Sequence, residues 1–226
     1  MKQTIIFSEV ENINSYRTAI AFSKLPDYAV YVLHKKNERQ IEDKDIKVLE
    51  IEERRQNELK NALECIEEAE GSIDILVLSA GKHCEQDGRI TDGHDYEALL
   101  DTVDENINGA VQVVRATLGL LRKGTGKRIV LLTEEDSSIN LNKQKQDYGY
   151  LMSLAALNML QKQLFNELRP EGFTFRCYAF GSGEKKGISP VDYIKMQLCY
   201  DKDDAYIHSE ENRIVMRNGM LRELPW

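Results

Sequence analysis

Tyr150 is the first candidate for chemistry, because its phenol begins a run of apolar residues with helical spacing, YLMSLAALNML. A tyrosine has an ordinary pKa of about 10, so a phenol that acts as a base near pH 7 needs a cation to stabilise the phenolate. On a helix, the residue four positions later lies on the same face, and here that residue is Leu154. Leucine carries no charge and no hydrogen-bond donor. This helix therefore lacks the partner that would activate its tyrosine.

Three lysines elsewhere in the sequence are the alternative sources of positive charge. Lys143 and Lys145 precede the helix in the polar segment EEDSSINLNKQKQDYGY, and Lys162 lies two turns beyond Leu154. We expect Lys143 and Lys145 to be solvated loop charges and Lys162 to face outward. A loop lysine that folds back towards Tyr150 remains the alternative.

The elements that must position these residues are strand-length apolar runs that alternate with amphipathic segments. Runs such as IDILVLS and RIVLLT are continuously apolar, which is typical of strands covered by helices on both faces. Repeated strand–helix–strand order predicts an α/β fold, a doubly wound parallel sheet in a single domain over residues 1–226. The predicted strands are Gln3–Phe7, Ala29–Leu33, Lys47–Ile51, Ile73–Ser79, Lys127–Thr133, Thr174–Phe180 and Arg213–Met216. The predicted helices are Tyr16–Leu25, Arg54–Ala69, Tyr96–Leu121, Tyr150–Leu168 and Val191–Leu198.

Composition argues against several classes of protein. The chain has 226 residues and a formal net charge of -8, with no basic stripe, so we expect no nucleic-acid partner. No run approaches the ~20 apolar residues of a membrane span, and the first residues become polar too soon for a signal peptide. The cysteines and histidines are scattered, so no metal site is predicted. Reduced thiols without an export signal favour a cytoplasmic location.

Five motifs in succession resemble those of the short-chain dehydrogenase/reductase family, and the resemblance covers nearly the whole chain. Their order and spacing carry the resemblance, since each motif alone is weak. The motifs are SIDILVLSAG, ENINGAVQVVRATL, YGYLMSLAALNML, FRCYAFGSG and AYIHSEENRIVMRNG.

Members of this family transfer hydride between NAD(P) and a carbonyl or alcohol. The resemblance implies that Tyr150 is the acid/base, that Ser137 or Ser138 steadies the substrate oxygen, and that Asn106 belongs to a proton relay. The family lysine, which lowers the tyrosine pKa and holds the nicotinamide ribose, is replaced by Leu154. The alternative for the two serines is a polar turn, and for Asn106 it is contact with backbone groups.

The segment after the first strand departs furthest from the family pattern TGxxxGxG, because Phe7–Phe22 contains no glycine. Glycines there permit a tight turn and close approach of the backbone to pyrophosphate. Asn12 is a candidate for positive φ, and Ser15 a candidate cap for the helix that follows. Glu9 and Glu11 bring negative charge to a helix N-terminus that would otherwise attract phosphate. We therefore expect that this segment does not bind a dinucleotide in the way that the family's glycine-rich loop does.

Other positions on the cofactor side are retained. Ser79, Ala80 and Gly81 would line the adenosine side of the crevice, where small residues leave room for a ligand. Gly183 keeps the glycine of the family Pro-Gly pair, with Ser182 in place of the proline.

Two functions follow from these residues. In the first, the protein has lost standard hydride transfer and binds a small molecule in the crevice at the strand C-terminal ends, or serves as a non-catalytic subunit. The family resemblance implies homo- or hetero-oligomers formed through the helices near 96–121 and 150–168. In the second, the protein is an active oxidoreductase with an atypical site. Its cofactor is unknown, and would be NAD or NADP only if the standard site still functions.

Overall fold

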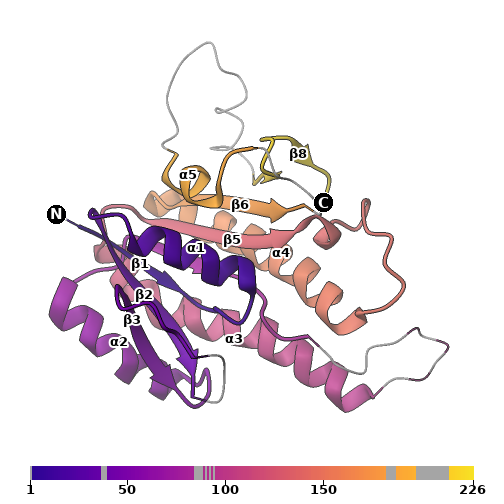
Figure 1. Cartoon of the computed structure of the whole chain (residues 1–226), viewed down its shortest axis with the longest axis horizontal. Helices are drawn as coiled ribbons and strands as arrows, with labels where there is room; N and C mark the ends of the chain where they lie inside the picture. Colours follow the sequence, from indigo (N-terminus) through magenta and orange to yellow (C-terminus); the bar gives the residue numbers. More distant parts are fainter. Residues whose placement is uncertain are drawn as a thin grey trace, which may run out of the picture.

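A parallel β-sheet forms the centre of the molecule. The computed structural model describes residues 2–36, 40–83, 89, 91, 93, 95–181, 187–196 and 214–226. Within these ranges the sheet has the strand order β3-β2-β1-β4-β5-β6-β7-β8, and only β7 and β8 pair antiparallel (Figure 1). The strands are β1 Gln3–Phe7, β2 Tyr28–Lys35, β3 Ile46–Ile51, β4 Ile75–Leu78, β5 Arg128–Glu134, β6 Thr174–Phe180, β7 Met216–Arg217 and β8 Glu223–Leu224. The predicted Rossmann-like, doubly wound sheet is confirmed.

Helices cover both faces of this sheet (Figure 1). One hydrophobic core joins α2, α3 and α4 to one face, and a second joins α1 and α5 to the other. Successive strand residues point to opposite faces, so Ile6 belongs to the first core and Ile5 to the second. The α-helices are α1 Ile13–Ser23, α2 Gln56–Glu70, α3 Tyr96–Lys123, α4 Tyr148–Leu168 and α5 Pro190–Lys195, and the short 3-10 turns are η2 Glu135–Ser137 and η3 Arg169–Glu171.

The start of α1 corrects two expectations from the sequence. The helix begins at Ile13, and Asn12 caps it, because its Oδ1 accepts hydrogen bonds from the backbone N–H groups of Asn14 and Ser15. Asn12 has a φ of -63°, so it does not adopt the positive φ considered for it. Ser15 lies inside the first turn and is not the cap. An asparagine at the cap satisfies helix N–H groups that a serine further along cannot reach.

The sequence KGTGKR, at the end of α3, forms a turn before β5. The buried Asp74 accepts hydrogen bonds from the backbone N–H groups of Thr125 and Gly126, both at 2.9 Å. A Cβ atom at Gly124 would lie 2.0 Å from the Ile73 carbonyl oxygen, so only glycine fits. This turn connects α3 to β5, and its hydrogen bonds to Asp74 hold it against the residues that precede β4. Its role is therefore structural.

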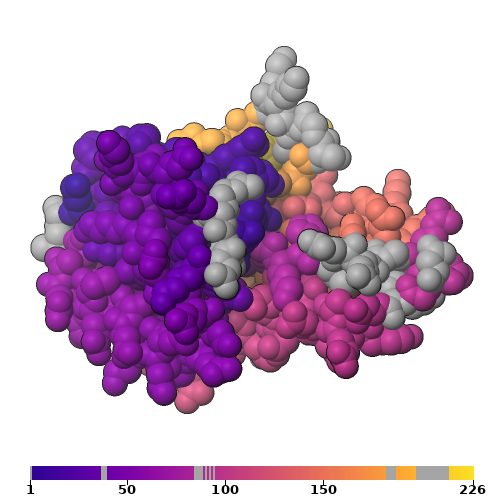
Figure 2. Space-filling view, turned by 60° about the horizontal axis from the view of Figure 1, so that its bottom comes forward, coloured from indigo at the N-terminus to yellow at the C-terminus, as the bar shows by residue number. Residues whose placement is uncertain are grey.

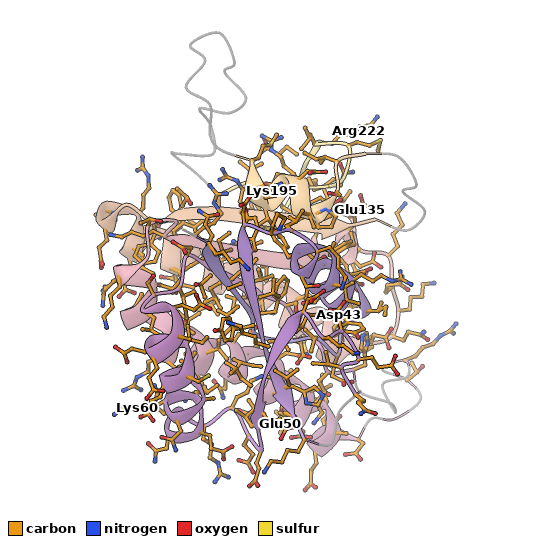
Figure 3. All side chains as sticks on the ribbon, turned by 60° about the vertical axis from the view of Figure 1, so that its left-hand side comes forward. Asp43, Glu50, Lys60, Glu135, Lys195 and Arg222 are labelled. Atoms are coloured by element: carbon orange, nitrogen blue, oxygen red, sulfur yellow. The ribbon has the colours of Figure 1, made fainter. Side chains whose placement is uncertain are left out.

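The C-terminal strands and the outer surface complete the fold. The last predicted strand, Arg213–Met216, corresponds to β7 at Met216–Arg217, and Arg213 lies outside the described residues. The short strand β8 was not predicted. Charged side chains such as Lys60 and Glu50 project from the outside of the layers (Figure 3). No described helix is both long enough and apolar enough to span a membrane.

Candidate functional site

Tyr150 lies in the first turn of α4, at the carboxyl edge of the sheet, and its phenol is buried. The hydroxyl donates a hydrogen bond of 3.2 Å to Oε1 of Glu134 and accepts one of 3.4 Å from Nδ2 of Asn12. The imidazole of His83 stacks on the phenol ring, with centroids 3.7 Å apart. The phenol therefore has a carboxylate, an amide and an aromatic ring as neighbours.

These surroundings keep the proton on the phenol. Burial raises the pKa of Tyr150 well above its ordinary value, and the neighbouring Glu134 carboxylate raises it further. Leu154 is 1% exposed and belongs to the core on the face of the sheet covered by α2, α3 and α4. Its side chain is aliphatic and supplies no positive charge to Tyr150. No lysine contacts Tyr150 in the part of the chain that the structure describes. Lys143 and Lys145 are exposed, and the Lys162 Nζ lies 5.0 Å from the centre of the Phe165 ring.

Glu134 is the residue that sequence reasoning missed at this position. It ends β5, and the strand thereby carries its carboxylate to the Tyr150 hydroxyl. The two serines proposed for this position have other partners. The Ser137 Oγ contacts the Met216 sulfur at 3.4 Å, and the Ser138 Oγ accepts the Leu141 N–H at 3.2 Å. Glu134 accepts the hydrogen bond of the phenol, and Ser137 and Ser138 lie at the end of the η2 turn that follows β5.

Asn106 joins the end of β4 to α4. Its Oδ1 accepts the backbone N–H groups of Gly81 and Lys82 at 3.2 and 3.0 Å. Its Nδ2 donates to the Lys82 carbonyl oxygen and to the Ser153 Oγ, both at 2.9 Å. Three of these four contacts are to backbone groups, the fourth is to a side-chain hydroxyl, and none of the four is to Tyr150.

Residues predicted to line the cofactor side gather around the loop after β1. The hydroxyls of Ser15 and Ser79 both donate to the Glu9 carbonyl oxygen, at 2.6 and 3.4 Å. The Asn12 Nδ2 donates to the Ala80 carbonyl oxygen at 3.2 Å. The C-terminal ends of β1 and β4 are thereby closed against the start of α1. Gly183, the remaining predicted position, lies outside the described residues.

The side chain of Glu9 fills the space inside this loop. Glu9 is 5% exposed, and its Oε1 accepts the Glu11 backbone N–H at 2.5 Å. Its Oε2 accepts a hydrogen bond of 2.5 Å from the Arg54 guanidinium. A Cβ atom at Gly81 would lie 2.3 Å from the Glu9 Cδ, so the carboxylate group packs directly on this glycine. Glu9 therefore stands at the crevice, as expected, but its charge is compensated.

An alternating chain of charges extends from Glu9 to Lys35. Arg54, which follows β3, also pairs with Glu105 of α3, and Glu105 pairs with Lys35 at the end of β2. Two carboxylates and two cations thus link four elements of the fold, with no net charge. Neither Arg54 nor Glu105 is a motif residue with an expected role in the site. A cluster held by opposite charges needs no external counter-ion.

The residues present do not fit the NAD(P) that the family resemblance implies. A pyrophosphate needs open backbone and positive potential, whereas here a carboxylate fills the loop beside Gly81. Among the described residues, no three histidine, cysteine or acidic side chains are grouped as metal ligands.

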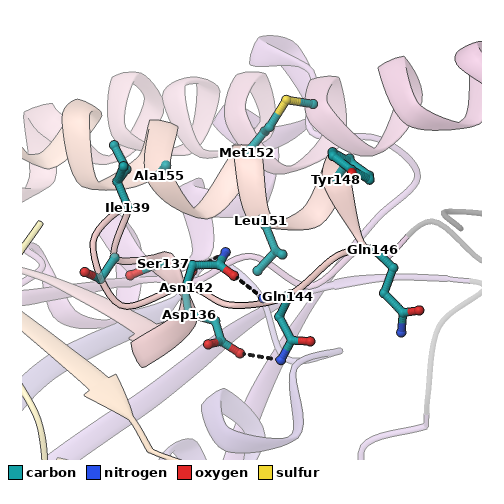
Figure 4. A pocket seen from close by; sticks show the side chains of 11 residues that line it. Asp136, Ser137, Ile139, Asn142, Gln144, Gln146, Tyr148, Leu151, Met152 and Ala155 are labelled. Atoms are coloured by element: carbon teal, nitrogen blue, oxygen red, sulfur yellow. Dashed lines mark hydrogen bonds between the residues drawn. The ribbon is translucent and has the colours of Figure 1, made fainter. Parts of the chain in front are cut away.

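A separate hollow of about 360 Å³ opens between η2, the following loop and α4 (Figure 4). One wall is polar, and there Gln144 donates to the Asp136 carboxylate at 3.0 Å. The other wall includes the apolar side chains of Leu151 and Met152 on α4. Another hollow, of about 420 Å³, lies at the opposite edge of the sheet, where Lys24 and Asp45 on its wall form an ion pair. Only the first hollow lies at the carboxyl edge, where doubly wound sheets bind ligands.

Comparisons with known proteins agree with this architecture. The family model described as short chain dehydrogenase matches residues 21–184. The C-signal protein of Myxococcus xanthus is 35% identical over 106 residues, which cover 46% of this chain and 61% of that protein. An uncharacterized oxidoreductase of Schizosaccharomyces pombe is 29% identical over 126 residues, or 51% of this chain and 46% of that protein. The matches thus span about half the length of these curated relatives.

Solved structures show the same fold at low sequence identity. Carbonyl reductase Sniffer of D. melanogaster superimposes with a TM-score of 0.72 and 21% identity, and the match covers 100% of both chains. The RhlG/NADP active-site complex of Pseudomonas aeruginosa gives a TM-score of 0.63 at 16% identity, over 80% of this chain and 72% of that one. At these identities the likeness concerns the fold alone.

Proposed function

This chain belongs to the short-chain dehydrogenase family, and from the site it carries we propose that it has lost standard NAD(P)-dependent hydride transfer. The single observation that carries the proposal is the Glu9 carboxylate, buried in the loop after β1 and paired with Arg54. A protein of this kind acts as a small-molecule-binding or non-catalytic oligomer subunit.

The surroundings of Tyr150 support the same proposal. Hydride transfer to a carbonyl also requires a proton donor whose conjugate base is accessible near neutral pH. The Glu134 carboxylate opposes formation of the phenolate, and Leu154 provides no compensating ammonium. The phenol is therefore a hydrogen-bonding group in a closed network rather than an acid/base.

Apolar side chains on α3 and α4 support assembly into an oligomer. Tyr96 and Leu100 of α3 are 71% and 64% exposed, and Met159 of α4 is 59% exposed. Tyr96, Leu100 and Val111 of α3 follow a roughly helical repeat, and Met152 adds to the exposed surface of α4. Figure 2 shows one face on which the magenta start of α3 lies at the surface beside the indigo and purple segments that precede it in the chain. Apolar side chains this exposed on two neighbouring helices are compatible with a protein–protein contact, and we propose that a second copy or a related subunit covers them.

The hollow between η2 and α4 is the proposed place for a small molecule. Amide and hydroxyl groups and the Asp136 carboxylate on one wall, with aliphatic side chains on the other, suit a ligand that carries both polar and apolar groups.

An active oxidoreductase with an atypical site is the second candidate. The family membership and the oxidoreductase name of the yeast relative favour it. The two candidates differ in whether the protein binds NAD(P)H.

Thermal unfolding with NADH and NADPH tests the proposal. A ligand at 100 times its Kd adds about 2.7 kcal/mol of stability, which raises the Tm of a domain of this size by roughly 5–10 °C. We expect no change in Tm at millimolar concentrations of either cofactor. A clear rise, followed by cofactor oxidation with a panel of carbonyl compounds, would establish the active oxidoreductase instead.

A further inference from the structure

We infer that the Glu9 carboxylate is a built-in substitute for an anionic ligand, and that its removal opens an anion-binding site centred on the Arg54 guanidinium. This inference rests on the proposed function, because it assumes that no cofactor phosphate binds in the loop after β1 and that the Glu9 carboxylate takes its place.

The contacts of the Glu9 carboxylate are those that an anion would make. One oxygen accepts the backbone N–H of Glu11 and the other accepts a guanidinium N–H of Arg54, each at 2.5 Å. Backbone N–H groups at a loop and an arginine fork are the donors that proteins use for phosphate and carboxylate. The carboxylate also packs against Gly81, so an external anion has no room while Glu9 is present.

The charges of the cluster also support an anion-binding site at Arg54. With Glu9 in place, Arg54 and Lys35 are matched by Glu9 and Glu105. Without Glu9, Arg54 keeps its ion pair with Glu105 but loses the carboxylate at Nη2. The side chain of Arg54 is 7% exposed, so water replaces the lost carboxylate poorly. A small anion that enters the vacated space takes the place of that carboxylate.

The test uses inorganic pyrophosphate as the probe, with isothermal titration calorimetry on the purified chain. Glu9→Ala keeps a Cβ atom and removes the carboxylate. We expect it to bind pyrophosphate at least about tenfold more tightly than the unmodified protein, because a desolvated arginine forms strong charge-assisted hydrogen bonds. Adding Arg54→Met to Glu9→Ala should abolish the gain.

Glu67→Gln is the matched control for net charge. Glu67 forms an exposed ion pair with Lys123 at 2.6 Å on the outside of α2, so its loss makes the same change in charge away from the crevice. A folded Glu9→Ala variant that binds no more tightly than Glu67→Gln would overturn the inference. Equal binding by Glu9→Ala with and without Arg54→Met would also overturn it.

Folding of the variant provides a second measurement. If Glu9→Ala is unfolded alone, pyrophosphate should restore its far-UV circular dichroism relative to sodium chloride at the same ionic strength. Absence of this recovery would count against the inference. The proposed function fails separately, if the unmodified protein binds NADH or NADPH.

Discussion

The hydroxyl of Tyr150 donates a hydrogen bond of 3.2 Å to the carboxylate of Glu134. Ionisation of the phenol would remove this hydrogen bond and place two negative charges side by side. Because the Tyr150 phenol is buried and Glu134 is partly buried, solvent screens that repulsion only in part. The arrangement reverses the one that activates a tyrosine as a base, in which a cation stabilises the phenolate.

Glu134→Gln should lower the pKa of Tyr150. The substitution keeps a hydrogen-bond acceptor but removes the charge, which is the largest cause of the raised pKa after burial. Ultraviolet difference titration measures the change, with Tyr150→Phe identifying the signal of this one phenol. An unchanged titration curve would mean that burial alone holds the proton.

The stability of the protein should fall above pH 10, in part because of Tyr150. A raised folded-state pKa means that the unfolded chain releases this proton first, at its ordinary pKa of about 10. The contribution is fully present below that pH and is lost above it, by about 1.4 kcal/mol per pH unit. Chemical denaturation between pH 9 and 11 measures the slope. Tyr150→Phe should show a shallower decline, and equal slopes would contradict the assignment.

Leu154→Lys should destabilise the protein without creating hydride transfer. Leu154 lies in the core, where an unpaired ammonium is poorly solvated. We expect a loss of about 3 kcal/mol or more, measured by urea denaturation. Leu154→Met is the control, with a cost below about 1.5 kcal/mol because its volume is similar. A Leu154→Lys protein that oxidises NADPH with a carbonyl substrate would show that the missing lysine alone explains the lost activity.

Asn106→Ala should cost about 2 kcal/mol of unfolding free energy, because it leaves the partly buried N–H groups of Gly81 and Lys82 without their acceptor. Asn108→Ala on the same helix is the control, since Asn108 is exposed, and it should change stability by less than about 0.5 kcal/mol. Equal effects of the two substitutions in urea denaturation would mean that the hydrogen bonds of Asn106 do not stabilise the fold.

Met159→Glu should dissociate the proposed oligomer. It places a charge within the exposed apolar surface of α4, where a partner subunit would have to desolvate it. Light scattering after size-exclusion chromatography should show a decrease in mass relative to Asn61→Glu, which adds the same charge at an exposed position on α2. A monomeric unmodified protein would remove the proposal.

The sequence predicted much of the fold because strand and helix periodicity are local properties. Thr174–Phe180 was predicted to the residue, and the start of α3 at Tyr96 was also correct. The start of α1 was displaced because the cap depends on which side chain reaches the free N–H groups. β8 was missed because two residues show no periodicity.

The sequence by itself determined the α/β architecture, the absence of a lysine at position 154 and the absence of glycine after the first strand. Only the tertiary structure decided what replaced these groups. Glu134 meets Tyr150, and Arg54 meets Glu9 across 45 positions of sequence, because strand ends from distant segments converge at one edge of the sheet. Local patterns carry no information about such pairs, since the order of the strands selects which charges become neighbours.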